Sequence, residues 1–237
     1  VRDRSDRYAN TLQAGDSFMT ANTTPGLQVM DHPLVAHKLT ILRRKDTPSH
    51  VFRHTLHELS WLLAHPTFAA LKTVKDNIET PLEMMTAATM RAPFPCLVSI
   101  LRAGNGLIDG FSHVCPEASV GHLGLYRDHD TMTPVSYYTS LPSDIEKRQV
   151  ILGDPMLATG GSAIMAVEKL REIGVTDMVF SCLVAAPEGV AALQSAHPDV
   201  PIITAALDRE LNDKCYILPG LGAVSYTHLR AHETFTD

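Results

Sequence analysis

The second half of the chain alternates between short apolar runs and stretches with helical spacing of apolar residues. The apolar runs predict buried strands: CLVSIL, ASVGHLGLY, VILG, MVFSCLVA and PIITAAL, at 96–101, 118–126, 150–153, 178–185 and 201–207. The intervening stretches predict helices: GLIDGFSHV, SAIMAVEKLREIG and EGVAALQSAH, at 106–114, 162–174 and 188–197. Gly174 stands where a glycine commonly follows a helix. Repeated strand–helix–strand units predict an α/β fold, with a largely parallel sheet and helices on both faces.

The remaining segments have weaker patterns. Ser49–His65 has apolar residues at helical spacing after a serine suited to cap a helix. Thr67–Met90 is mixed, and we expect it to be helical with an irregular piece near Pro81. Residues 1–29 are polar without a period, which predicts a disordered leader. Tyr126–Leu141 is polar and aromatic, and we expect a two-stranded arm that projects from the sheet.

Composition narrows the class of protein. A chain of 237 residues can bury a sizeable core, in one domain or in one domain with a small appendage. Its net charge of −6 and the lack of a basic patch argue against a general nucleic-acid binder. We expect no association with a membrane, because no apolar run reaches spanning length and the chain starts without a secretory segment. Four scattered cysteines predict reduced thiols in a cytoplasmic protein.

The stretch Val150–Ser162, VILGDPMLATGGS, carries the clearest chemical signal. Asp154 follows a buried strand at its carboxyl end, where open α/β sheets bind their ligands. Residues 159–162 then bring backbone N–H groups, two hydroxyls and little bulk to a helix start, which favours an anion. The lysine of a Walker loop is absent, so we expect a sugar phosphate, with Asp154 on ribose hydroxyls and the loop on the 5′-phosphate. The alternative is an ordinary strand–turn–helix connection.

Arg102 is the second candidate. It directly follows the apolar run 97–101 and precedes Ala-Gly-Asn-Gly. This arrangement can present a guanidinium and free N–H groups to diphosphate oxygens. The glycines that follow do not fit the dinucleotide pattern GxGxxG. Asp109 is better explained as a helix-surface carboxylate than as a base, and the run 128–130, Asp-His-Asp, as solvated loop residues rather than a metal site.

Several motifs, in one order along the chain, resemble those of the uracil phosphoribosyltransferases. DPMLATGGS at 154–162 is similar to the family's phosphoribosyl-diphosphate motif, and SILRAGNGLIDG at 99–110 to its diphosphate loop. Further matches are DHPLVAHKLTILR, GLYRDHDTMTPVSYYTSLP, LVAAPEG and YILPGLG, which resemble the family's start, arm, following strand and turn, and uracil loop. The resemblance extends from about Met30 to Gly222.

The resemblance implies a type I phosphoribosyltransferase-like fold over residues 30–222. That fold is a parallel sheet flanked by helices, with a small hood built from both chain ends and a projecting β-arm. The implied reaction belongs to pyrimidine salvage and converts uracil and 5-phospho-α-D-ribose 1-diphosphate to UMP and diphosphate. Mg²⁺ is expected to arrive with the diphosphate substrate, and no metal ligand is assigned to the protein.

Specific residues take roles by the same resemblance. Catalytic roles fall to Arg102, Arg127 and Asp154. These three are expected to bind phosphoribosyl diphosphate together with the loop residues Pro155, Met156, Leu157, Ala158, Thr159, Gly160, Gly161 and Ser162. Uracil is expected at main-chain atoms of Ile217 and Gly222, with Ala223 and Val224 beside them.

Family likeness stops after Gly222. The family continues with Asp-Ala-Gly-Asp, whereas this chain has Ala-Val-Ser-Tyr from Ala223. Residues 224–234 can be encoded by a DNA string that resembles a transposase sequencing adapter, with the junction inside codon 223. We therefore interpret 223–237 as a non-native tail that has replaced an aspartate which, in the family, helps bind phosphoribosyl diphosphate.

Two alternatives stay open at this point. One is a phosphoribosyltransferase for another base, and the other is a non-catalytic nucleotide-sensing homologue that keeps the phosphate loop. Intact Arg102, Arg127 and Asp154 favour catalysis. The resemblance suggests a homodimer or larger homo-oligomer, and it leaves open whether a purine nucleotide activates the enzyme.

Overall fold

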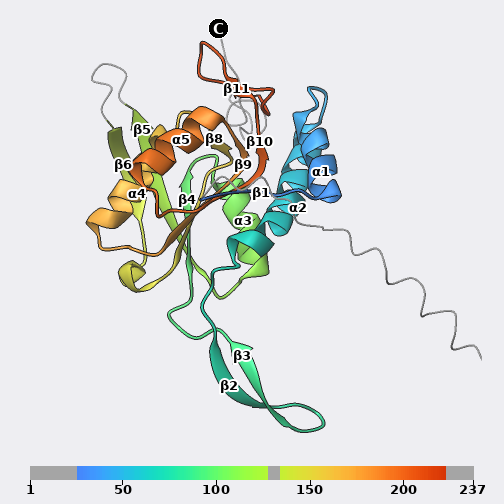
Figure 1. Cartoon of the computed structure of the whole chain (residues 1–237), viewed down its shortest axis with the longest axis vertical. Coiled ribbons are helices and arrows are strands. Elements are labelled where there is room, and N and C mark those ends of the chain that lie inside the picture. Colours follow the sequence, from blue (N-terminus) through green and yellow to red (C-terminus); the bar gives the residue numbers. More distant parts are fainter. Residues whose placement is uncertain (1–25, 128–133, 223–237) are drawn as a thin grey trace, which may run out of the picture.

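A mainly parallel sheet forms the centre of the molecule. The structure is a computed structural model that describes residues 26–127 and 134–222 (Figure 1). Neighbouring strands lie in the order β1 (Leu27–Val29), β10 (Ile202–Leu207), β9 (Met178–Ala185), β7 (Val150–Gly153), β4 (Cys96–Leu101), β5 (Ser119–Arg127) and β6 (Pro134–Ser140). A short strand, β8 (Met156–Leu157), also pairs with β9. Within the described residues, each neighbouring pair of this sheet is parallel except β5–β6.

Helices cover both faces of this sheet, as the sequence predicts (Figure 1). One face carries α1 (Pro33–Arg43), α2 (Ser49–Thr67) and α3 (Asn105–Val114), and the other carries α4 (Gly161–Glu172) and α5 (Pro187–Ala196). Strand β4 supplies both cores because its side chains alternate: Val98 and Ile100 pack with α4 and α5, whereas Leu97 packs with α2 and α3. The α/β fold class is thus confirmed.

The expected helix within Thr67–Met90 is wrong. Strands β2 (Val74–Glu79) and β3 (Met84–Thr89) form an antiparallel hairpin that extends away from the sheet (Figure 1). The turn between them is closed by Thr80, whose N–H donates to the Glu83 carbonyl at 2.9 Å and whose hydroxyl accepts the Glu83 N–H at 3.0 Å. A threonine that satisfies turn groups in this way competes with helix formation.

Three other expectations are corrected or refined. The disordered leader does not reach residue 29, because β1 pairs with β10 along Leu27–Val29; residues 1–25 lie outside the described part. Ser49 is the first residue of α2 rather than its cap, which is Pro48. Of the arm expected over Tyr126–Leu141, only β6 lies wholly within that range; it pairs antiparallel with β5, which begins at Ser119, and the two strands form an edge of the main sheet.

The remaining elements are short. A 3₁₀ turn covers Ile145–Lys147, and β11 (Glu210–Leu211) pairs with β12 (Ile217–Leu218). Gly174 follows α4 with a φ of +92°, which confirms its expected place after the helix. Among the described residues, no helix is both long enough and apolar enough to span a membrane.

Candidate functional site

Two loops meet where the chain changes direction across the sheet. Strands β4 and β7 are parallel neighbours, with Ser99 opposite Gly153 at their carboxyl ends. After β4 the chain enters α3 on one face, and after β7 it enters α4 on the other. Such a switch point leaves a crevice between the two loops, which is where doubly wound sheets bind ligands.

The two loops are packed backbone against backbone. A Cβ placed on Gly104 would lie 2.5 Å from the carbonyl oxygen of Gly153 and 2.6 Å from that of Ile100. Beneath the first loop, the buried Ser99 hydroxyl donates to Asn105 Oδ1 at 2.7 Å. Only a glycine permits this approach, so Gly104 lets the loop after β4 pack directly against the end of β7, where the second loop starts.

Arg102 extends from the first loop into solvent. It directly follows β4, the Leu101–Arg102 peptide is cis, and the side chain is exposed. Its guanidinium has no ion-pair partner among the described residues. Among the described residues, the N–H donors of this guanidinium have no carboxylate partner, and a planar group with five donors is suited to bind a phosphate or diphosphate group.

Asp154 lies at the start of the second loop, deeper than Arg102. Its main-chain N–H donates to the Ser181 carbonyl at 3.2 Å, which fixes the residue to β9. Its carboxylate receives one long hydrogen bond, from the Met156 N–H at 3.5 Å. Burial raises the pKa of the Asp154 carboxyl to about 7, and the Met156 N–H opposes that rise only weakly. A carboxylate held with most of its acceptor capacity unused is suited to accept bonds from a pair of hydroxyl groups.

The loop that follows turns into α4 through Gly160. This glycine has a φ of +81°, in the left-handed region, and precedes the first helical residue, Gly161. Within the described chain the N–H groups of Gly160 and Ser162 have no hydrogen-bond partner, and that of Gly161 makes only a 3.5 Å contact to the Thr159 hydroxyl. These N–H groups lie at the positive end of the α4 dipole, so the local geometry favours a phosphate, as the sequence predicts.

Helix α5 supports this loop from below. A Cβ on Gly160 would lie 3.0 Å from the Gly189 carbonyl oxygen and 3.1 Å from the Ala192 Cβ. Glu188, the residue before Gly189, accepts a hydrogen bond from the Leu211 N–H at 2.9 Å. This bond lowers the pKa of the Glu188 carboxyl. The first turn of α5 thus contacts both the phosphate loop and β11. Sequence reasoning missed this role, although both residues stand in the quoted motif LVAAPEG.

The segment after β11, Tyr216–Gly222, forms an irregular loop. Ile217 and Leu221 are buried in the same apolar cluster that Met156 and Ala158 of the phosphate loop pack against. Gly222 is exposed, with a φ of +73° and open space where a Cβ would stand. The loop Tyr216–Gly222 and the loop before α4 therefore pack against the same apolar cluster. The main chain near Gly222 faces solvent.

Several predicted site residues are only partly placed. The backbone of Arg127 ends β5, opposite Pro134, at the same carboxyl edge of the sheet as Arg102. Ala223 and Val224 lie outside the described residues, as do the run 128–130 and the expected tail 223–237. Asp109 is exposed on α3, consistent with a surface carboxylate.

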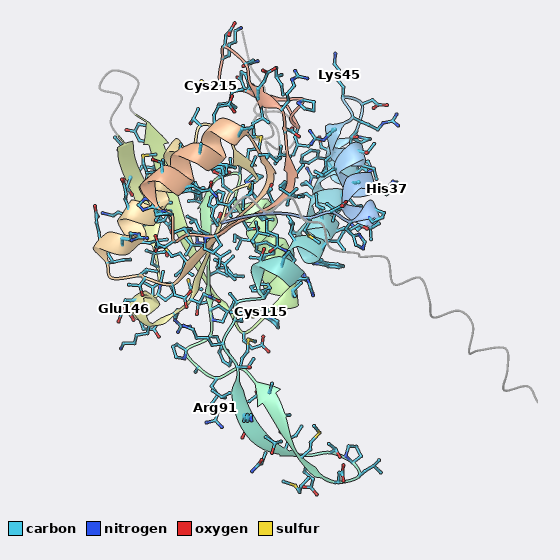
Figure 2. The ribbon with its side chains drawn as sticks, viewed as in Figure 1. His37, Lys45, Arg91, Cys115, Glu146 and Cys215 are labelled. Carbon is cyan, nitrogen blue, oxygen red and sulfur yellow. The ribbon has the colours of Figure 1, made fainter. Side chains whose placement is uncertain are left out.

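The four cysteines are free thiols; three are buried, and Cys215 is exposed. Figure 2 shows Cys215 near the top of the molecule and Cys115 lower down, above the hairpin that carries the Arg91 label. In the described part of the chain, no group of three or more histidine, cysteine, aspartate or glutamate side chains could hold a metal ion.

Comparison with known sequences gives one consistent family. A family model described as "Uracil phosphoribosyltransferase" matches residues 29–225. The uracil phosphoribosyltransferase of Acidovorax sp. is 56% identical over 196 residues, covering 83% of this chain and 94% of the relative. That of Rhizobium leguminosarum is 50% identical over 197 residues, with the same coverage of both chains.

Solved structures agree on the fold. The AQ2163 protein from Aquifex aeolicus superposes with a TM-score of 0.77 at 32% identity, covering 84% of this chain and 95% of its own. Adenine phosphoribosyltransferase from Trypanosoma brucei superposes with a TM-score of 0.56 at 13% identity, covering 83% of this chain and 90% of its own. The second likeness concerns the fold alone, because its sequence identity is low.

Proposed function

The chain belongs to the uracil phosphoribosyltransferase family, and we propose that Arg102, Asp154 and the phosphate loop carry out that family's reaction. The reaction is a pentosyl transfer: uracil and 5-phospho-α-D-ribose 1-diphosphate give UMP and diphosphate. The observation that carries the assignment is the half-buried Asp154 carboxylate at the start of the loop that leads from β7 to α4, where N–H groups have no partner among the described residues, while the exposed Arg102 follows the neighbouring strand β4. These three features match the ribose diol, the 5′-phosphate and the diphosphate of one substrate.

Each group has a distinct task in this chemistry. As the bond between the anomeric carbon and diphosphate breaks, positive charge builds on the ribose and negative charge on the leaving group. Arg102 stabilises the departing diphosphate, and Arg127 is proposed as the second arginine toward the same substrate. Asp154 accepts hydrogen bonds from the ribose hydroxyls, while residues 158–162 hold the 5′-phosphate. The base nitrogen forms the new bond and loses its proton, so no covalent nucleophile on the protein is required.

Mg²⁺ is proposed as part of the substrate. The described residues offer no group of three or more histidine, cysteine, aspartate or glutamate side chains that could hold a resident metal. A hard cation with oxygen ligands is well suited to travel on the diphosphate itself, where it offsets phosphate charge. The protein then needs to bind the magnesium–diphosphate complex, not the free ion.

Uracil is proposed to bind at main-chain atoms of Ile217 and Gly222, with Ala223 and Val224 beside them. A uracil edge alternates carbonyl acceptors and N–H donors, and exposed backbone groups can pair with that pattern. Because the family has an aspartate where this chain has Ala223, we propose that residues 223–237 are a foreign sequence. Resequencing the source gene past codon 222 tests this, and confirmation of the Ala-Val-Ser-Tyr codons would refute it.

Assembly and setting are also proposals. The β2–β3 hairpin extends from the core and exposes Leu82, Met84 and Met85, which favours a homodimer or larger homo-oligomer. Four unpaired thiols fit a reducing cytoplasm. An activating purine nucleotide has no assigned site. The nucleotide-sensing alternative is not favoured, because the relatives are named as transferases.

The direct test is UMP formation from uracil, phosphoribosyl diphosphate and Mg²⁺ by the full chain, beside an Ala223→Asp variant. Turnover by either protein supports the assignment, and a gain in the variant would show that residue 223 matters. Competition with cytosine, adenine and hypoxanthine separates uracil from other bases. UMP binding without turnover in both proteins would favour the nucleotide-sensing alternative, and an absence of both binding and turnover would overturn the assignment.

A further inference from the structure

An ion pair between the last residue of α1 and the residue after β10 makes hydrogen bonds to one glycine of the Tyr216–Gly222 loop. Arg43 Nη1 donates to Asp208 Oδ2 at 2.9 Å, and Nη2 donates to Oδ1 at 2.7 Å. The same Nη1 donates to the Gly220 carbonyl at 2.8 Å. The Gly220 N–H donates in turn to Asp208 Oδ2, also at 2.8 Å. Arg43 therefore binds the carbonyl of Gly220, and Asp208 binds its N–H.

The pair is poorly accessible to water. The side chain of Asp208 is 5% exposed and that of Arg43 is 24% exposed. Removing two charges from water is costly, and apolar residues of similar volume commonly stabilise a core as well or better. A role confined to stability therefore explains the pair poorly. What apolar residues could not supply is the pair of hydrogen bonds to Gly220.

Gly220 lies at the point where the loop reverses. Its φ is +64°, and a Cβ there would collide with the carbonyl oxygen of Ile217. On one side, Ile217 is fixed by the pairing of β12 with β11; on the other, Leu221 is buried and Gly222 is exposed. The direction in which the main chain of Gly222 points is thus set by how Gly220 is held.

We propose that Arg43 and Asp208 are positioning residues that orient the main-chain groups of the 217–222 loop for recognition of the base. They do not touch the substrate; they act through Gly220. The inference rests on the proposed function, because the loop's contact with uracil is part of that proposal. It predicts that damage to the pair weakens binding of the base and spares binding of the ribose phosphate.

The test compares two ligands that differ only in the base. Dissociation constants of UMP and of ribose 5-phosphate are measured by calorimetry on the full chain, on Arg43→Lys and on Asp208→Asn. Lysine keeps the charge but cannot reproduce the planar fork that holds Asp208 and Gly220 together. Asparagine keeps an acceptor but turns an NH₂ group toward Arg43. We expect UMP affinity to fall at least about tenfold, the scale of one misplaced hydrogen bond, and ribose 5-phosphate affinity to stay within about twofold.

A second ion pair of the same residue types provides the matched control. Arg171 Nη2 lies 2.6 Å and 2.7 Å from the two carboxylate oxygens of Asp199, between the last turn of α4 and the turn after α5. Arg171→Lys and Asp199→Asn should leave both affinities unchanged. Melting temperatures of all four variants are measured alongside, and Arg43→Lys carries the test if Asp208→Asn fails to fold.

The outcomes separate the inference from its premise. Equal loss of both ligands in Arg43→Lys, or no loss of either, would overturn the positioning role. A parent chain that binds UMP no better than ribose 5-phosphate would remove the loop's assignment to the base, and this inference with it. A parent chain that binds neither ligand would refute the proposed function itself.

Discussion

Gly189, in the first turn of α5, contacts Ala158 of the phosphate loop through main-chain atoms. A Cβ placed on Gly189 would collide with the Ala158 carbonyl oxygen and lie 2.8 Å from that of Leu157. The Ala186 N–H, just before the helix, donates to the same Leu157 carbonyl at 2.9 Å. Helix α5 therefore acts as the floor of the loop, and its closeness sets where the loop's N–H groups lie.

A methyl group at this contact should weaken phosphate binding selectively. We expect Gly189→Ala to lower stability by about 1–3 kcal/mol, the usual cost of overpacking. Because the loop itself must move, KM for phosphoribosyl diphosphate should rise roughly tenfold or more, with a smaller change in KM for uracil. Steady-state kinetics and thermal unfolding measure both effects. Ser195→Ala, at an exposed position of the same helix, is the control, and an unchanged KM in Gly189→Ala would show that the contact does not position the loop.

Binding of the ribose should depend on pH through Asp154. Its carboxyl has a pKa of about 7, and the charged form is the better acceptor for two hydroxyls. We expect kcat/KM for phosphoribosyl diphosphate to rise as pH increases from 6 to 8, with an apparent pKa near 7. Phosphate groups of the substrate titrate in the same range, so the Asp154→Asn variant serves as the reference for their contribution. A pH profile shared by both proteins would contradict the prediction.

The same shift has a consequence for folding. The folded pKa of about 7 lies above the ordinary value of 3.8, so the native state keeps a proton that the unfolded chain has lost. Stability contributed by the neutral carboxyl is complete below about pH 4 and is lost as pH rises toward 7. Asp154→Asn should therefore raise the melting temperature more at pH 8 than at pH 5, while it lowers kcat/KM by roughly 10- to 100-fold. A melting-temperature difference independent of pH would argue against a raised pKa of the half-buried Asp154 carboxyl.

Much of the fold could be predicted because its strands are buried on both faces. Runs such as Met178–Ala185 are almost continuously apolar, a pattern that parallel sheets covered by helices require. The position of the loop 154–162 was predictable for a related reason: Asp154 and the glycines after it interrupt an otherwise apolar pattern, and that interruption lies at a strand's carboxyl end.

Other features depend on contacts between distant segments. The β2–β3 hairpin has mostly exposed residues, so burial leaves no clear period in its sequence, and the turn at Thr80 decides its structure. Arg43 donates hydrogen bonds to Asp208, 165 positions further along the chain, and to Gly220, 177 positions further along. Neither partner stands out in its local pattern, because charged residues at helix and strand ends are common. Three-dimensional packing alone reveals their relation.

Arg102 should be important for turnover and unimportant for stability. Its side chain is exposed and has no ion-pair partner among the described residues, so its removal should cost little stability. We expect Arg102→Ala to reduce kcat by roughly 10²- to 10³-fold, the usual effect of removing a group that stabilises developing charge, with no change in melting temperature. Arg91→Ala, on the hairpin side of the molecule (Figure 2), is the control because Arg91 is also exposed and forms a surface ion pair with Asp76. Full activity in Arg102→Ala would exclude a role in leaving-group stabilisation.

The hairpin should contribute to self-association. Leu82 at its tip is 95% exposed and Met84 is 63% exposed, which is unusual for large apolar side chains on an isolated monomer. We expect Leu82→Asp with Met84→Asp to reduce the molar mass measured by light scattering after gel filtration. Ile173→Asp, an exposed apolar position after α4, should leave that mass unchanged. An unaltered mass in the hairpin variant would place any subunit interface elsewhere.

The contact between α2 and α3 offers a test of packing alone. Gly110 faces Ser60 so closely that a Cβ on the glycine would collide with the serine Cβ and lie 3.1 Å from its hydroxyl. Gly110→Ala should therefore lower stability by about 1–3 kcal/mol by pushing the helices apart. Removing the opposing side chain should restore part of the loss, so Ser60→Gly with Gly110→Ala is expected to unfold at a higher temperature than Gly110→Ala alone. Ser60→Gly by itself costs helix propensity and the hydroxyl's bond to the Leu56 carbonyl, and it completes the double-mutant cycle. Additive effects in that cycle would contradict direct contact between the two positions.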